Sequence, residues 1–233
     1  MKKIAFLSVG LSLVILFSQT QFVCASDITP LNTEGDAICE PCSVSQYKSA
    51  SNWAVQTLQK ANAASIIPAR LQGNYKSLIT REEFASLIVS LYETLHNEEA
   101  TILLENPFID SFNLDVLKAY HLGFMNGTSE KEFSPNNFIT REEISVILAR
   151  FIQKESQLDL NQIDVSDLQG FYLDEPSFAE WSKDSILKLT KINLMKGIAP
   201  NKFGAKNETT IEQAVVFVFR IYELISSETT IQE

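Results

Sequence analysis

Hydrophobic residues recur with helical spacing in three long stretches of the chain. In the first stretch, Phe84, Leu87, Ile88, Leu91 and Leu95 lie at positions i, i+3, i+4, i+7 and i+11. Comparable stripes are formed by Ile144, Ile147, Leu148, Phe151 and Ile152, and by Ala214, Phe217, Val218, Ile221 and Ile225. Each stripe predicts an amphipathic helix with one face to bury.

A shorter helix is predicted before each long one. These helices are expected near residues 53–61, 114–121 and 181–189, and polar stretches at 97–106 and 155–170 are expected to be linkers. The first helix of the same or of a neighbouring unit is the obvious partner for each apolar stripe. The pattern therefore predicts three helix-loop-helix units.

The units are copies of one another. Ile79-Thr80-Arg81-Glu82-Glu83 returns as Ile139-Thr140-Arg141-Glu142-Glu143, and again as Thr209-Thr210-Ile211-Glu212-Gln213. The shift that takes Thr140 to Thr210 also aligns Met125-Asn126-Gly127 with Met195-Lys196-Gly197, Phe133 with Phe203, Arg150 with Arg220, and Lys118 with Lys188. We place the copies at residues 47–98, 106–155 and 171–226, and refer to them as the first, second and third copy.

The repeated motif contains a helix start. Thr80 with Glu83, and Thr140 with Glu143, fit the capping box, in which each side chain accepts a hydrogen bond from the other residue's backbone N–H. Thr210 in the third copy has Gln three positions later, and Gln can make the same contact. Capping is thus the expected role of these threonines and of their partners.

Arg81 and Arg141 are not explained by capping. They occupy the first helical turn, where the helix dipole disfavours a cation. A guanidinium beside free N–H groups is well placed to bind a carboxylate or another anion. The alternative is a weak surface pair with the adjacent Glu82 or Glu142.

The loops between the paired helices carry Gly127 and Gly197, followed by Phe133 and Phe203. Glycine permits a tight turn with positive φ, so we expect that conformation at both glycines. The phenylalanines are expected to pin the loops to the core.

Residues 1–25 have the pattern of a secretory signal peptide. A basic start is followed by a mainly apolar run at 4–17, and Val23 and Ala25 are small residues suited to cleavage after Ala25. Residues 1–25 are therefore predicted to be an export signal, with a permanent N-terminal anchor as the alternative.

Residues 26–46 are predicted to be a linker that contains Cys39 and Cys42. In an exported protein this C-x-x-C pair favours a small disulfide loop, and free thiols or a disulfide to a partner are the alternatives. No second cysteine pair exists to complete a zinc site, so no metal site is expected.

Composition excludes several classes of protein. With 45% hydrophobic residues the chain can form a core, and its formal charge of −10 argues against nonspecific binding of nucleic acid. The only histidines are His96 and His121, and no nucleophile, metal-protease or phosphate-loop motif occurs. We expect neither catalysis nor a cofactor.

These motifs resemble the S-layer homology (SLH) domain. The resemblance covers about residues 47–226, because the elements recur in the same order in three copies. Its marks are Trp53-Ala54, Phe108-Ile109-Asp110, Gly127, Phe133-Ser134-Pro135, the Thr-Arg-Glu-Glu motifs at 80 and 140, Phe171 to Asp174, and Trp181.

The resemblance implies an all-α fold, in which three tandem repeats form a pseudo-threefold spindle. It also implies non-covalent attachment at the bacterial cell surface to an anionic secondary cell wall polysaccharide, often one that carries pyruvate ketals. The grooves between repeats would bind the polymer, and Arg81 and Arg141 would be ligand contacts. Trp53 and Trp181 either pack in the core, which we favour, or border the grooves. The full set of candidate ligand-binding residues is Arg81, Arg141, Thr80, Thr140, Glu82, Glu142, Gly127, Gly197, Trp53 and Trp181.

The chain departs from the family pattern at several positions. Ile211 replaces the arginine in the third copy, Ser111 replaces the tryptophan in the second, and the first copy lacks the Phe-x-Asp start. At most two good ligand sites are therefore expected. The alternative function is that of a degenerate module, which acts mainly in protein–protein interaction or as a subunit in envelope assembly.

Overall fold

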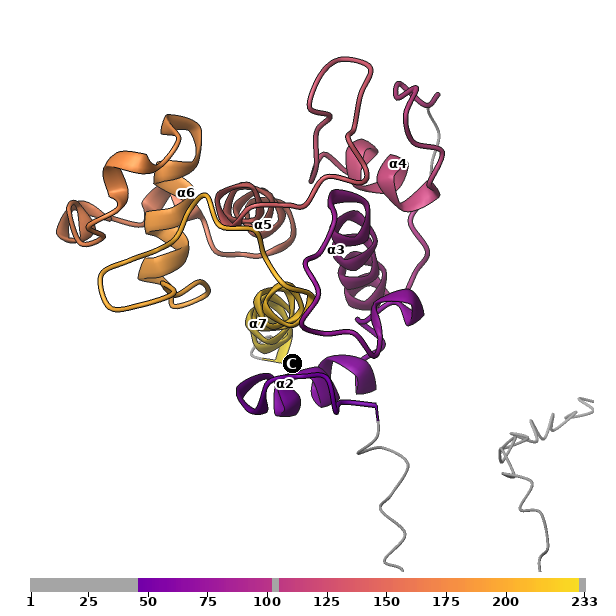
Figure 1. The fold of residues 1–233 in the computed structure, drawn as a ribbon, viewed down its shortest axis with the longest axis horizontal. Helices are drawn as coiled ribbons and strands as arrows, with labels where there is room; N and C mark the ends of the chain where they lie inside the picture. Colours follow the sequence, from indigo (N-terminus) through magenta and orange to yellow (C-terminus); the bar gives the residue numbers. More distant parts are fainter. Residues whose placement is uncertain (1–45, 102–104, 231–233) are drawn as a thin grey trace, which may run out of the picture. The chain divides into compact units, whose positions relative to one another are not determined.

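The computed structural model describes residues 46–101 and 105–230, and within these ranges the chain is helical (Figure 1). The α-helices are α2 (Asn52–Ala63), α3 (Arg81–His96), α4 (Leu114–His121), α5 (Arg141–Glu155), α6 (Glu180–Lys191) and α7 (Ile211–Thr230). Short 3₁₀ helices lie at Ala69–Leu71, Leu160–Gln162, Ser166–Leu168 and Glu175–Ser177. These ranges contain isolated β-bridges but no strand. The predicted all-α class is confirmed, and each predicted helix lies where its pattern placed it.

Capping boxes begin the helices α3 and α5. The Thr80 hydroxyl accepts a hydrogen bond from Glu83 N, and the Glu83 carboxylate accepts one from Thr80 N at 2.8 Å. Thr140 and Glu143 form the same pair. At the start of α7, Gln213 takes the place of the glutamate at 3.4 Å. The predicted helix starts are confirmed.

A closed ring of three backbone hydrogen bonds joins the residues that precede the long helices. Ile79 N donates to Thr209 O at 2.9 Å, Thr209 N to Ile139 O at 3.1 Å, and Ile139 N to Ile79 O at 3.1 Å. Each copy thus donates to one of the others and accepts from the third. The ring brings the three helix starts together.

The first N–H groups of each long helix are satisfied by the loop of another copy. At the first residue of each helix, the backbone N–H of Arg81 donates to Asn137 O at 2.8 Å, that of Arg141 to Asn207 O at 2.9 Å, and that of Ile211 to Ser77 O at 2.9 Å. At the second residue, the backbone N–H of Glu82 donates to Pro135 O, that of Glu142 to Ala205 O, and that of Glu212 to Tyr75 O. The expectation of free N–H groups beside the arginines is therefore wrong, because backbone carbonyls already accept from them.

The short helices pack across the copies rather than within them. α4 packs on α3, α6 packs on α5, and α2 packs on α7. The first helix of each copy therefore covers the second helix of another copy. The pairing of α2 with α7 joins the first copy to the third (Figure 1).

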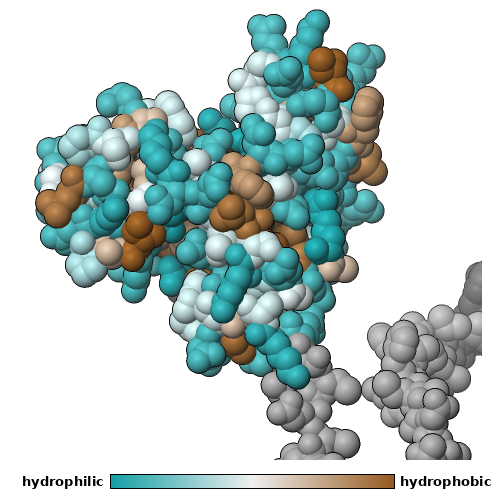
Figure 2. Space-filling view, viewed as in Figure 1, coloured by the Kyte–Doolittle hydropathy of each residue, from teal (hydrophilic) through white to brown (hydrophobic). Residues whose placement is uncertain are grey.

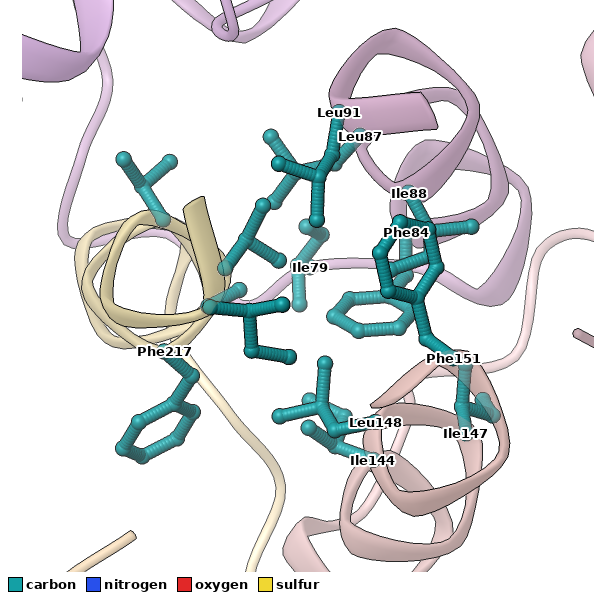
Figure 3. Packing of buried hydrophobic residues seen from close by; sticks show 14 of the residues in the cluster. Ile79, Phe84, Leu87, Ile88, Leu91, Ile144, Ile147, Leu148, Phe151 and Phe217 are labelled. Atoms are coloured by element: carbon teal, nitrogen blue, oxygen red, sulfur yellow. The ribbon is translucent and has the colours of Figure 1, made fainter. Parts of the chain in front are cut away.

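The apolar stripes of α3, α5 and α7 meet in one core. Figure 3 shows Phe84 and Ile88 of α3 beside Phe151 of α5, with Leu148 nearby, whereas the ring of Phe217 on α7 points away from them. All five are buried, as the helical spacing predicts. On the face drawn in Figure 2, hydrophilic residues dominate and hydrophobic ones form small separate areas.

Several predictions lie outside the described residues. These are the signal peptide at 1–25, nearly all of the linker at 26–46, and the pairing of Cys39 with Cys42. The threefold spindle and the bounds of the copies also stay predictions. In the described ranges, no helix combines the length and the apolar character needed to cross a membrane.

Two buried glutamates hold the starts of short helices. Glu212, 5% exposed, accepts hydrogen bonds from the backbone N–H and the hydroxyl of Ser51, both at 2.8 Å, just before α2. Glu142, 4% exposed, accepts from Ala179 N at 3.2 Å, just before α6, and pairs with Lys206 at 2.6 Å. Each glutamate therefore stabilises the helix pair to which it belongs.

Replacing Glu212 by glutamine tests this coupling of α7 to α2. The neutral amide is a weaker acceptor for the two Ser51 donors, so we expect a loss of about 1–3 kcal/mol in the free energy of unfolding. Chemical denaturation measures the loss. Glu82→Gln is the matched control, because the Glu82 carboxylate has Arg70 as its one ion-pair partner among the described residues, at the surface, and its loss should be at most about 1 kcal/mol. Equal losses in the two variants would contradict this role of Glu212.

Candidate functional site

Arg81 reaches from the start of α3 into the loop of the second copy. The residue is 6% exposed, and it donates from Nε to Phe133 O at 3.0 Å and from Nη2 to Asn126 O at 2.9 Å. The guanidinium carbon lies 5.0 Å from the centre of the Phe133 ring. Nη1 pairs with Glu143 at 3.0 Å. The alternative of a surface pair with Glu82 is wrong, because the guanidinium contacts the second copy.

Arg141 makes the equivalent contacts with the loop of the third copy. It is 3% exposed and donates from Nε to Phe203 O at 3.1 Å and from Nη2 to Lys196 O at 2.6 Å. Its guanidinium carbon lies 4.8 Å from the centre of the Phe203 ring. Both arginines thus hold a glycine-containing loop in place, and neither pairs with the glutamate that follows it in sequence.

Burial lowers the pKa of both guanidinium groups. For Arg141, desolvation is the largest cause and brings the pKa to about 10, while the charges of Tyr172 and Asp174 act in the opposite direction. For Arg81, desolvation also lowers the pKa, and Glu143 is the main opposing influence. Each charged form is poorly solvated and therefore gains from a nearby negative charge.

Each arginine lies at one side of a groove. The Arg81 groove, of about 410 Å³, is lined by Arg81, Met125, Asn126, Gly127, Thr128, Glu143, Val146, Ile147, Arg150 and Trp181. The Arg141 groove, of about 300 Å³, is lined by Trp53, Arg141, Lys196, Gly197, Ile198, Gln213, Val216, Phe217 and Arg220.

The two grooves are built alike. Seven lining residues of the Arg81 groove have a counterpart in the Arg141 groove, at the shift that relates the second copy to the third. In the Arg81 groove they are residues 126, 127, 128, 143, 146, 147 and 150, and in the Arg141 groove residues 196, 197, 198, 213, 216, 217 and 220. Each groove also draws its arginine from one copy and its tryptophan from another. All three copies therefore contribute to each groove.

Trp53 and Trp181 border the grooves and do not pack in the core, which we had favoured. The two residues are 57% and 58% exposed. Each tryptophan immediately precedes a buried residue of its helix, Ala54 in α2 and Ser182 in α6. That position lies off the buried stripe, so the indole faces the groove.

Gly127 and Gly197 are required for close approach and not for positive φ. Neither has a positive φ, contrary to our expectation. A Cβ at Gly127 would lie 2.5 Å from Ser129 O, and one at Gly197 would lie 2.4 Å from Lys202 O. Because these neighbours are backbone atoms, larger residues do not fit without moving the loop.

Four predicted site residues line neither groove. Thr80 and Thr140 cap their helices, Glu82 pairs with Arg70, and Glu142 holds the start of α6. The structure therefore assigns them to the framework of the grooves and not to their lining.

Arg150 and Arg220 are groove residues that we had not selected. They come from α5 and α7, and Arg220 donates from Nη1 to Leu194 O at 2.8 Å. The sequence did contain a signal, because the two arginines align when the second copy is placed on the third.

The third junction between copies lacks the corresponding residues. Ile211 is buried where the other copies have arginine, and Ser111 takes the place of tryptophan. Ser86 corresponds to Val146, and it is hydrogen-bonded to Arg70 and to Asp115. The side chains of Ser86, Arg70 and Asp115 thus bind one another at this junction, and the number of ligand sites stays a prediction.

Comparison with known proteins identifies the type of module. Residues 111–144 match the S-layer homology domain family. The chain is 28% identical over 151 residues to an endoglucanase of Bacillus sp. (strain KSM-635), which is 61% of this chain and 16% of that protein. It is 25% identical over 179 residues to the exoglucanase XynX of Acetivibrio thermocellus, 74% of this chain and 16% of that protein.

A surface-layer 125 kDa protein of Lysinibacillus sphaericus is 25% identical over 188 residues, 79% of this chain and 14% of that protein. The chain thus spans 16% or less of the length of these three relatives. The chain contains a segment, residues 111–144, that is similar to the S-layer homology domain. The S-layer homology match and the surface-layer relative indicate that the module associates with the bacterial cell surface.

Replacing Gly127 by alanine tests the close approach in the groove loop. The new Cβ meets two backbone carbonyls, so we expect a loss of about 2 kcal/mol or more in the free energy of unfolding. Gly170→Ala is the control, because Gly170 has φ +73° and no atom near its Cβ position, and it should lose only about 1 kcal/mol. Chemical denaturation compares the two. A smaller loss of unfolding free energy for Gly127→Ala than for Gly170→Ala would show that the loop can accommodate a Cβ at Gly127.

Proposed function

We propose that the chain is a non-catalytic binding protein of the cell envelope. It attaches without a covalent bond to an anionic secondary cell wall polysaccharide, such as one that carries pyruvate ketals. The Arg81 groove and the Arg141 groove each bind a sugar unit of that polymer.

The observation that carries this proposal is the recurrence of one groove at two junctions. In both grooves a buried arginine, a glycine turn, a second arginine and an exposed tryptophan converge. A tryptophan more than half exposed at a concave site offers an apolar surface against which a ligand can pack. The groove therefore has an apolar face for a sugar ring and cations for its acidic substituent.

The presence of two like grooves on one chain also supports a polymeric ligand. Two such sites bind two units of the same polymer, and the second contact forms at a raised effective concentration. Modest affinity in each groove is then enough for firm attachment. This mode of binding suits a wall polymer, which repeats the same unit many times.

Co-sedimentation with purified Gram-positive-type walls tests the proposal. The test variant is Trp53→Ala with Trp181→Ala, because both side chains are exposed and their loss leaves the fold intact. The control is Phe112→Ala with Leu173→Ala, which truncates residues that are 83% and 80% exposed but line neither groove. We expect the wild-type protein and the control to pellet with the walls, and the test variant to lose at least about 90% of its binding, as sites built on aromatic anchors do.

Walls stripped of their non-peptidoglycan polymer complete this experiment. Binding should disappear with the polymer. A wild-type protein that pellets equally with stripped walls, or a tryptophan variant that binds as well as the control, would contradict the proposal.

A second candidate function is protein–protein interaction. It is favoured by the third junction, where the neighbouring residues Ile109, Phe112 and Leu114 are 68%, 83% and 64% exposed. In the same sedimentation experiment this function predicts the reverse order, in which the Phe112→Ala variant loses binding to intact envelopes and the tryptophan variant retains it.

A further inference from the structure

The two grooves differ in charge at two corresponding positions, where the Arg81 groove has Glu143 and Asn126 and the Arg141 groove has Gln213 and Lys196. Glu143 in the Arg81 groove corresponds to Gln213 in the Arg141 groove. Both residues perform the same capping task, since each accepts a hydrogen bond from the backbone N–H of the threonine three positions earlier. The difference between them therefore acts mainly on the groove.

In the Arg81 groove the guanidinium is fully engaged. Its Nε and Nη2 donate to backbone carbonyls, and Nη1 donates to the carboxylate of Glu143 at 3.0 Å. The positive charge of Arg81 thus has a negative partner within the protein. An anionic ligand would have to compete with Glu143 or approach against its charge.

In the Arg141 groove the third contact is missing. Nε and Nη2 donate to Phe203 O and Lys196 O, but Nη1 has no hydrogen-bond partner among the described residues. The oxygen of Gln213 accepts from Thr210 N, and its amide nitrogen is itself a donor. A buried guanidinium, on a residue that is 3% exposed, therefore lacks a carboxylate at the place where Arg81 has one.

The other charges strengthen the contrast. The Arg141 groove is lined by Arg141, Lys196 and Arg220 and by no acidic residue among those described. The Arg81 groove is lined by Arg81 and Arg150 together with Glu143.

The acids nearest to the Arg141 groove do not line it. Asp174 accepts hydrogen bonds from Phe203 N and Gly204 N, and Glu223 lies 3.7 Å from Lys60. Asp110 near Arg81 accepts from the equivalent loop N–H groups, so it does not create a difference between the grooves.

We infer that the Arg141 groove is a dedicated site for a carboxylate-bearing sugar, whereas Glu143 neutralises the Arg81 groove, which binds the same sugar independently of its charge. This inference rests on the proposed function and divides it between the two grooves. A ligand carboxylate at Arg141 supplies the acceptor that Glu143 supplies at Arg81. A charged hydrogen bond of this kind is stronger than a neutral one.

Binding of two matched small probes tests the inference. The probes are an N-acetylhexosamine methyl glycoside with a pyruvate ketal, and the methyl ester of the same compound, which lacks the charge. Trp181→Ala leaves only the Arg141 groove complete, and Trp53→Ala leaves only the Arg81 groove complete. In the Trp181→Ala background we expect the acid to bind at least about tenfold more tightly than its ester, from the strength of a charged hydrogen bond. In the Trp53→Ala background we expect the two probes to bind within about threefold of each other.

Exchanging the two residues then tests the cause. Gln213→Glu in the Trp181→Ala background should abolish the preference for the acid, and Glu143→Gln in the Trp53→Ala background should create it. Both exchanges preserve the capping contact, because each introduces the residue found at the equivalent position, and unchanged thermal unfolding would verify this. Preference for the acid in both grooves, or a preference that the exchanges do not move, would overturn the inference while leaving wall binding intact. Failure of the wild-type protein to bind both the probes and the walls would overturn the proposed function instead.

Discussion

The backbone hydrogen bonds at the starts of α3, α5 and α7 are the constraint on which the remaining structure depends. A helix begins with N–H groups that have no acceptor within the helix. Here those groups are buried at a junction, and carbonyls from the loop of another copy accept from them. No copy can satisfy its own helix start. The three copies therefore fold as a set, and the loop that completes each helix start is fixed at a defined distance from it.

The same constraint builds the grooves. The loop that supplies the carbonyls also contains Gly127 or Gly197, and the arginine at the helix start binds two further carbonyls of that loop. Arg141 has two functions, because it fixes the wall of its groove and keeps Nη1 without a hydrogen-bond partner among the described residues. At the third junction, Ile211 keeps the backbone contact but has no guanidinium to offer. At this junction the backbone contacts of the fold are therefore present without the arginine side chain found in the two grooves.

Periodicity and repetition made most of the fold predictable. Apolar spacing located α3, α5 and α7, and the Thr-x-x-Glu pattern located the first residues of α3 and α5, because both signals act over a short stretch of sequence. The partners of the short helices were not predictable, since pairing within a copy and between copies buries the same stripe. We expected free N–H groups beside Arg81 because their acceptors, Pro135 and Asn137, belong to a different copy and lie far away in the sequence.

The site was predictable in part. Arg81, Arg141, Gly127 and Gly197 stood out because a cation at a helix start and a repeated glycine both need an explanation beyond local structure. Trp53 and Trp181 were found, but their large apolar surface favoured the core, and only the helix register shows that they face outward. Arg150 and Arg220 lie in the middle of helices, and only the tertiary structure shows that they line the same grooves as Arg81 and Arg141.

The packing of α2 on α7 makes the order of the copies cyclic. Every copy donates its helix start to one other and receives from the third, so the contacts themselves define no first or last member. The contacts between the copies therefore do not depend on which two copies the chain leaves unconnected. A circular permutant, opened in the polar stretch between the second and third copies and joined from α7 to α2 by a short linker, would contain the same set of contacts. Such a permutant would present an attached cargo from a different junction, which makes the direction of display adjustable without touching either groove.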